Sequence, residues 1–116
     1  MTAPCVDSPS DGMTIETVPT TEGCAVTVHG DVDAGSAPAL RACLLEVLDR
    51  PGVTTVHLDL TRVTFLDSAG LTVLVVAHRA AERSGRVLAL RCGTSRAVVR
   101  PLTITGLFGV LTVVDA

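Results

Sequence analysis

The chain has 116 residues, a formal net charge of −3 and a hydrophobic fraction of 47%. This length predicts one domain that can bury an ordinary core. Phe65 and Phe108 are its only aromatic residues, so the core must be built from Val, Leu, Ile and Ala. The acidic balance, without any basic cluster, argues against nucleic-acid binding, which needs a concentrated positive surface.

The four cysteines predict no metal site, because they form no CxxC pair and no Cys/His ligand spacing. They are Cys5, Cys24, Cys43 and Cys92. Four reduced thiols are the simplest interpretation, and a redox link between Cys24 and Cys92 is the alternative. The N-terminus does not resemble a signal peptide, and the longest nearly apolar run, Ala69 to Ala77, is too short to span a bilayer. We therefore expect a soluble, cytoplasmic protein.

Residues 1–13 are rich in Ser, Pro, Asp and Gly and predict a flexible N-terminal arm. A first strand is expected from Met13 to Val18, and a second from Gly23 to His29. Alternation places Cys24, Val26 and Val28 on one face of the second strand.

A carboxylate-rich turn, GDVDAG, follows at residues 30–35. Ser36 is a favourable helix cap and Pro38 is tolerated in a first turn, so we expect a helix from Ala37 to Leu48. The next strand is expected from Thr55 to Leu60, with His57 and Asp59 on the face opposite its apolar residues.

The C-terminal half predicts a helix from about Ser68 to Ser84, a strand from Arg86 to Leu90 and a short helix capped by Thr94 or Ser95. Pro101 should kink that helix or end it early. Val110 to Val114 should form a last extended piece. Two antiparallel strands followed by alternating helices and strands predict an α/β sheet with helices on its face.

Wound at about 100° per residue, the helix from Ser68 has two apolar strips and one sector suited to water. That sector holds Ser68, Thr72, Val76, Arg79 and Arg83. An exposed apolar residue flanked by arginines is typical of a modest protein interface. A solvated helix face with one stray valine explains the spacing equally well.

Ser68 has three possible roles. It could be a helix cap only, because Ser and Asp are favoured at helix starts for stability alone. It could be a phosphorylation site, where free N–H groups and the helix dipole tolerate added negative charge. A phosphate would then place a charge of about −2 in any interface that uses the exposed sector, and would repel an acidic partner.

The third role is a catalytic nucleophile, which needs a base and an oxyanion hole. His57 and Asp59 lie two residues apart on one strand face and could touch each other. The nucleophile pattern G-x-S-x-G is absent, however, because Leu66 stands two residues before Ser68. A small serine hydrolase is therefore a distant alternative. Nucleotide binding has no support either, since no Gly-rich phosphate loop is present.

The segment from Leu58 to Leu71, LDLTRVTFLDSAGL, resembles the signature of STAS-domain anti-sigma factor antagonists, also called anti-anti-sigma factors. Gly30 to Asp33 and the following APAL at residues 37–40 match their first loop and helix start. Gly85-Arg86-Val87 and Thr105-Gly106-Leu107 match later landmarks. The resemblance implies one STAS domain over residues 14–116, with a mixed, mostly parallel sheet of four to five strands and helices packed mainly on one face.

The resemblance also implies a bacterial partner switch. The unphosphorylated antagonist binds an anti-sigma factor, which releases a sigma factor, and phosphorylation by that same anti-sigma factor, an ATP-using serine kinase, ends binding. By position, Ser68 is the phosphoacceptor, and Ala69 stands where Ser or Thr is often found. Asp33 and Asp31 belong to a neighbouring loop that helps engage the kinase, although turn formation would explain both aspartates without a partner.

The motif and the exposed helix sector together give the candidate partner-binding residues. These are Asp31, Asp33, Asp67, Ser68, Ala69, Gly70, Thr72, Val76, Arg79 and Arg83. The antagonist itself would be no enzyme and would need no cofactor or metal, because ATP is bound by the partner. We expect a monomer without direct contact to nucleic acid or membrane. A STAS module of another signalling complex, without phosphate control, is the alternative.

Overall fold

The computed structural model describes residues 12–114. Its elements follow one another as β1 (Met13–Pro19), β2 (Gly23–Val32), α1 (Ala37–Leu48), β3 (Thr55–Leu66), α2 (Ser68–Arg83), β4 (Val87–Arg91), α3 (Arg96–Ile104), the 3-10 turn η1 (Leu107–Gly109) and β5 (Thr112–Val113). Residues 1–11 of the predicted arm lie outside the described residues. Met13, which the domain division placed in the arm, begins β1 and is buried.

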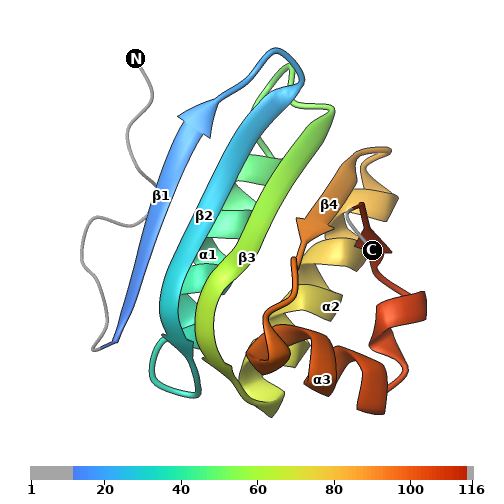
Figure 1. The fold of residues 1–116 in the computed structure, drawn as a ribbon. Coiled ribbons are helices and arrows are strands. Elements are labelled where there is room, and N and C mark those ends of the chain that lie inside the picture. Colours follow the sequence, from blue (N-terminus) through green and yellow to red (C-terminus); the bar gives the residue numbers. More distant parts are fainter. Residues whose placement is uncertain (1–11, 115–116) are drawn as a thin grey trace.

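The five strands form one sheet in the order β1-β2-β3-β4-β5 (Figure 1). The pair β1–β2 is antiparallel, and the pairs β2–β3, β3–β4 and β4–β5 are parallel. Helices α1 and α2 follow β2 and β3 and lie behind the sheet in this view. The prediction of a mixed, mostly parallel α/β sheet is confirmed.

The core lies between the sheet and the two helices α1 and α2. Cys24, Val26 and Val28 of β2 are buried, as their alternation predicts. In β3, Val56, Leu58 and Leu60 are fully buried, whereas His57 and Asp59 are half-buried on the other face. Branched aliphatic side chains therefore fill this core without any aromatic residue among the fully buried ones.

Both long strands extend further than their alternation predicts. Strand β2 continues to Val32 and β3 to Leu66, and their pairing shifts register between Thr27 and His29 and again between Gly30 and Asp31. Each shift inserts an irregularity that breaks the period of two. The alternation of apolar and polar residues therefore ends at the first bulge, although the two strands continue to pair beyond it.

Helix α3 lies beside the C-terminal part of β3, where β4 no longer pairs with that strand. Strand β4 pairs only with residues 55–59 of β3, and beyond them the Ser95 hydroxyl donates to the Val63 carbonyl at 3.2 Å. Of the two effects expected of Pro101, a kink or an early end, the early end does not occur, since α3 continues to Ile104. Burial of Val98 and Leu102 against the sheet outweighs the missing backbone hydrogen bond.

The C-terminal piece is less extended than expected. The chain turns at Gly106, which has a φ of 78°, and η1 follows it. Only Thr112 and Val113 then pair as β5, so the strand predicted from Val110 to Val114 is two residues long.

Candidate functional site

The two segments singled out in the sequence meet at one edge of the sheet. Strands β2 and β3 are parallel, so their carboxyl ends lie together, with Val32 opposite Leu66. The Asp67 amide donates to the Val32 carbonyl at 3.2 Å, which ties the start of α2 to the end of β2. The carboxyl edge of a parallel sheet is where open α/β folds place their functional residues.

The first turn of α2 is capped by Asp67 and not by Ser68. Oδ1 of Asp67 accepts hydrogen bonds from the amides of Ala69 at 2.9 Å and Gly70 at 3.1 Å. Ser68 is the first helical residue, it is exposed, and its hydroxyl has no hydrogen-bond partner among residues 12–114. The interpretation of Ser68 as a cap only is therefore wrong. Its hydroxyl is free for chemistry carried out by another molecule.

Gly70 has a packing role. It is buried, and a Cβ added there would lie 2.5 Å from Leu66 Cδ1 and 2.9 Å from Val32 Cγ1. Its absent side chain lets α2 approach the ends of β2 and β3 closely. We correct its place among the partner-binding candidates, because Gly70 faces the core, whereas the adjacent Ala69 is half-buried.

Asp31, near the end of β2, and Asp33, in the β2–α1 loop, both accept hydrogen bonds that hold the local backbone. Oδ1 of Asp33 accepts from the amides of Gly35 at 3.0 Å and Ser36 at 3.1 Å, so turn formation accounts for this carboxylate. Ser36 is buried, and its hydroxyl donates to the Asp31 carbonyl at 2.9 Å. Oδ1 of Asp31 accepts from the Thr64 hydroxyl at 2.6 Å, which links the end of β2 to β3.

The exposed sector of α2 lies where its periodicity predicts. Thr72, Arg79 and Arg83 are exposed and Val76 is half-buried, while Ser68 stands at the start of the row. Beside it, a groove of about 400 Å³ runs between the N-terminal halves of α1 and α2. Its lining includes Ala34, Ala37, Pro38, Arg41, Ala69 and Thr72. Small side chains keep the groove open next to the serine.

Phe65 is a residue that the sequence reasoning missed. Its side chain is 49% exposed, although it is one of only two aromatic residues in the chain. It pairs with Asp31 across the sheet, whereas the next pair, Val32 and Leu66, is buried. Because neighbouring strand residues point to opposite faces, Phe65 faces away from the helices. The alternation of β3 is broken by the bulges, so only its closeness to Ser68 in the motif could have indicated it.

With this geometry in view, comparison with known proteins identifies the family. The sequence profile of the STAS domain matches residues 13–116. The chain belongs to the STAS domain family. Its relatives include an anti-sigma-B factor antagonist of Listeria monocytogenes, 32% identical over 78% of this chain and 78% of that protein. Another is the anti-sigma-B factor antagonist of Staphylococcus epidermidis, 30% identical over 82% of this chain and 86% of that protein.

Solved structures share the fold of this STAS domain. A crystal structure of an anti-sigma factor antagonist from Mycobacterium paratuberculosis superposes with a TM-score of 0.80 at 25% identity, covering 94% of this chain and 91% of that one. The Bacillus cell fate determinant SpoIIAA in its phosphorylated form superposes with a TM-score of 0.65 at 21% identity, covering 89% of this chain and 91% of that one.

His57 and Asp59, the base and acid that the hydrolase alternative needs, are engaged elsewhere in the STAS domain. Nε2 of His57 lies 2.9 Å from Glu22 Oε1, and Oδ1 of Asp59 accepts from the Thr61 amide and hydroxyl at 2.8 and 2.6 Å. His57 also lies nine residues before Leu66 along β3, which at about 3.3 Å per residue is roughly 30 Å. His57 and Asp59 therefore do not form the dyad that the hydrolase alternative requires.

The three described cysteines, Cys24, Cys43 and Cys92, are buried and form no disulfide with one another, so Cys24 and Cys92 are not linked; Cys5 lies outside the described residues. Burial raises the pKa of the Cys24 thiol, and the nearby Arg50 partly offsets this effect. No cluster of three His, Cys, Asp or Glu side chains within residues 12–114 could hold a metal ion. No helix in this described part is long and apolar enough to cross a membrane.

Proposed function

We propose that this STAS domain is an anti-sigma factor antagonist controlled by phosphorylation of Ser68. In its unphosphorylated form it binds an anti-sigma factor, so that a sigma factor is released. The anti-sigma factor is also the serine kinase, and it binds the ATP. One observation carries this proposal: the Ser68 hydroxyl is exposed at the first residue of α2 and has no hydrogen-bond partner among the described residues.

The capping by Asp67 explains how a phosphate at Ser68 would act. The amides of Ala69 and Gly70 already donate to the Asp67 carboxylate, so they are not free to bind the phosphate. The helix dipole still favours negative charge at this end, so α2 stays folded. The phosphate, with a charge of about −2 beside the Asp67 carboxylate, is directed to solvent, where it repels an acidic partner surface.

The proposed partner surface is centred on Ser68. It runs along Thr72, Val76, Arg79 and Arg83 of α2, and it includes Ala69 and the α1–α2 groove. Asp31 and Asp33 shape the adjoining loop through their hydrogen bonds to Thr64 and Ser36. We assign Asp67 a positioning role, because its carboxylate holds the first turn of α2 and so fixes the direction in which the Ser68 side chain points.

Two kinds of relative support this proposal. The Listeria and Staphylococcus proteins, at 32% and 30% identity, are antagonists of anti-sigma-B factors. SpoIIAA, which has the same fold, exists in a phosphorylated form. By analogy, we infer that the chain acts by binding and does not catalyse a reaction itself.

The direct test is phosphorylation by candidate anti-sigma serine kinases of the same organism with ATP, followed by mass spectrometry. We expect one phosphate on Ser68 and none in Ser68→Ala. Phosphate on another residue, or on none with every candidate, would refute the switch.

Binding to the same anti-sigma factor then tests the charge argument. Ser68→Ala should bind as tightly as the unphosphorylated chain, and Ser68→Asp should bind at least about tenfold more weakly. Equal binding of the two variants would favour a STAS interaction module without phosphate control. Thr20→Asp, in the exposed β1–β2 connection, is a matched control that adds the same charge elsewhere.

A further inference from the structure

We propose that the outer face of α3 is a second docking surface, which binds an acidic amphipathic segment of a partner protein. This face holds Arg96, Val99, Arg100, Thr103 and Ile104, spaced three and four residues apart so that they lie on one side of the helix. Val98 and Leu102 lie on the other side, buried in the core.

The charge of the chain is distributed very unevenly. Residues 83–114 contain five arginines and no Asp or Glu, whereas the chain as a whole has a net charge of −3. Helix α3 lies within this region and has no acidic residue of its own.

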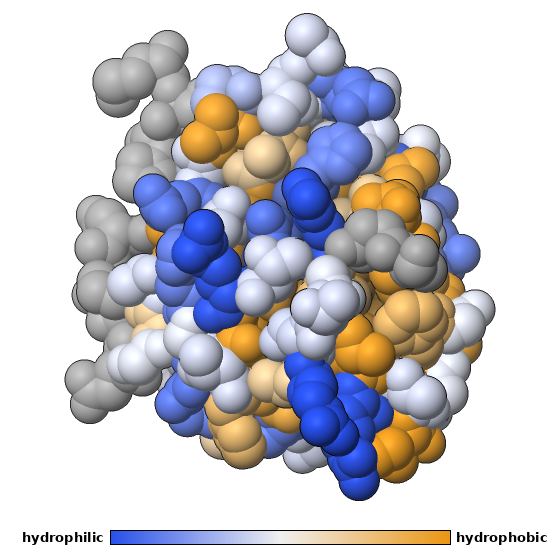
Figure 2. All heavy atoms as spheres, in the orientation of Figure 1, coloured by the Kyte–Doolittle hydropathy of each residue, from blue (hydrophilic) through white to orange (hydrophobic). Residues whose placement is uncertain are grey.

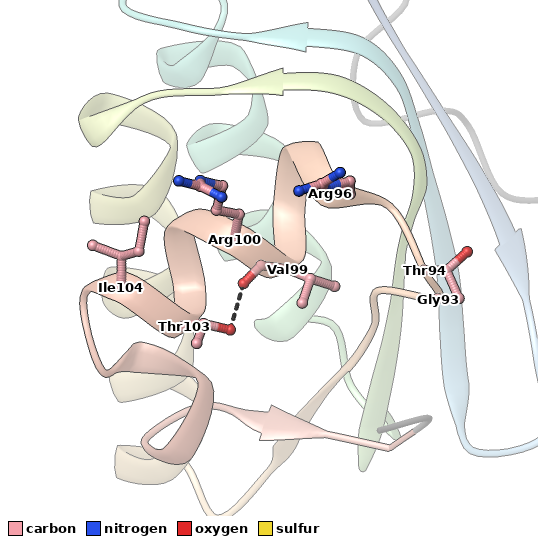
Figure 3. A pocket seen from close by; sticks show the side chains of 7 residues that line it. All are labelled: Gly93, Thr94, Arg96, Val99, Arg100, Thr103 and Ile104. Carbon is pink, nitrogen blue, oxygen red and sulfur yellow. Dashed lines mark hydrogen bonds between the residues drawn. The ribbon is translucent and has the colours of Figure 1, made fainter.

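Arg96 and Arg100 are the charged residues of the α3 face. Both are exposed, and neither guanidinium group forms an ion pair or hydrogen bond with any residue in 12–114. Like charges four residues apart on a helix repel each other, so a carboxylate placed between them would remove a repulsion and add two charge-assisted hydrogen bonds. Figure 3 shows the Arg96 and Arg100 side chains on successive turns of α3, with their guanidinium groups apart from each other.

Apolar surface adjoins these arginines. Ile104 is 70% exposed, the largest exposed fraction among the exposed large hydrophobic residues, and Val99 is half-buried. Together with Thr94 and Thr103 they border a shallow, mainly apolar groove of about 540 Å³. Hydrophilic and hydrophobic spheres lie next to each other over α3 in Figure 2. Apolar area beside arginines is the composition enriched in the centres of protein interfaces.

This composition favours an acidic protein segment over the other polyanions. Membrane surfaces and nucleic acids are bound mainly through many positive charges, and a lipid-binding cluster has about four to eight of them. The α3 face offers two, together with an apolar groove in which aliphatic side chains can be buried. A helix with Leu or Ile on one side and Glu or Asp next to them satisfies both features.

The test uses a synthetic helix of about 16 residues made of Leu and Glu, with Leu repeating every three to four residues. Its affinity is measured by fluorescence anisotropy, and the contact face is mapped from backbone amide shifts in the NMR spectrum of the whole chain. We expect the shifts to centre on α3. The double variant Arg96→Glu/Arg100→Glu should weaken binding at least about tenfold, and a matched Leu/Lys helix should bind that variant more tightly than it binds the wild type.

Three controls decide the outcome. Thr20→Asp, which adds a negative charge in the exposed β1–β2 connection, should leave the affinity unchanged, and a Leu/Gln helix should bind the wild type more weakly than the Leu/Glu helix. If the charge reversal unfolds α3, Arg96→Gln/Arg100→Gln provides the same test with less repulsion. Equal affinity of wild type and variant, shifts centred on another element, or tighter binding of this face to anionic vesicles or duplex DNA would overturn the proposal.

Discussion

Removal of the Asp67 side chain tests the assignment of the α2 cap. In Asp67→Ala, the amides of Ala69 and Gly70 lose an acceptor that lies 2.9 and 3.1 Å away. Loss of a helix cap costs about 0.5–2 kcal/mol. Because one carboxylate serves two amides in a half-buried position, we expect the upper part of this range, about 1–2 kcal/mol.

Urea unfolding followed by circular dichroism measures this loss. With a slope of about 2 kcal/mol/M, the midpoint should fall by about 0.5–1 M. Asp67→Asn keeps an acceptor oxygen and should recover most of the stability. Ser68→Ala removes a hydroxyl without a partner among the described residues and should change the free energy of unfolding by less than about 0.5 kcal/mol. If Ser68→Ala lowered the free energy of unfolding as much as Asp67→Ala does, the cap would be assigned to the wrong residue.

Three further predictions follow from single residues. Gly70→Ala should destabilise the fold by about 1–2 kcal/mol in the same urea assay, because its Cβ would collide with the buried ends of β2 and β3. Gly109→Ala, which meets open space, should change little. Val76→Ala, on the proposed partner surface, should weaken binding to the anti-sigma factor about 5- to 30-fold in a titration, whereas Val87→Ala, at an exposed apolar residue outside that surface, should not. Burial raises the pKa of the Cys24 thiol above its ordinary 9.0, so the folded state keeps a proton that the unfolded chain loses. Stability should therefore fall as the pH rises above about 9, and urea unfolding should show a smaller fall for Cys24→Ala.

The motif DSAG at residues 67–70 combines three separate physical roles. Asp67 accepts from the first amides of α2, Ser68 presents a free hydroxyl, and Gly70 lets the helix pack against Val32 and Leu66. Two of these roles support the fold, and only the serine is available to another molecule. A loss of partner binding in Asp67 or Gly70 variants must therefore be compared with their loss of stability.

The sequence by itself determined the sheet, the helices that cover it and the exposed side of α2. Period-two alternation in β2 and β3 and the 3.6-residue period from Ser68 onward depend only on which side chains avoid water. For that reason Cys24, Val56 and Leu74 are buried as predicted, and Arg79 is exposed as predicted. Helix α1 begins and ends at the expected residues, because Pro38 fits its first turn and Pro51 follows it.

Only the tertiary structure decided which residue does what at the carboxyl edge of the sheet. Asp67 and Ser68 are both common at helix starts, so composition cannot tell the capping residue from the exposed one, whereas hydrogen-bond geometry does. The exposure of Phe65 depends on bulges between β2 and β3, which have no period to detect. The continuation of α3 past Pro101 depends on burial of Val98 and Leu102 against a sheet that is distant in sequence. These three features depend on contacts between residues far apart in the chain, so they cannot be read from the local pattern of apolar and polar residues.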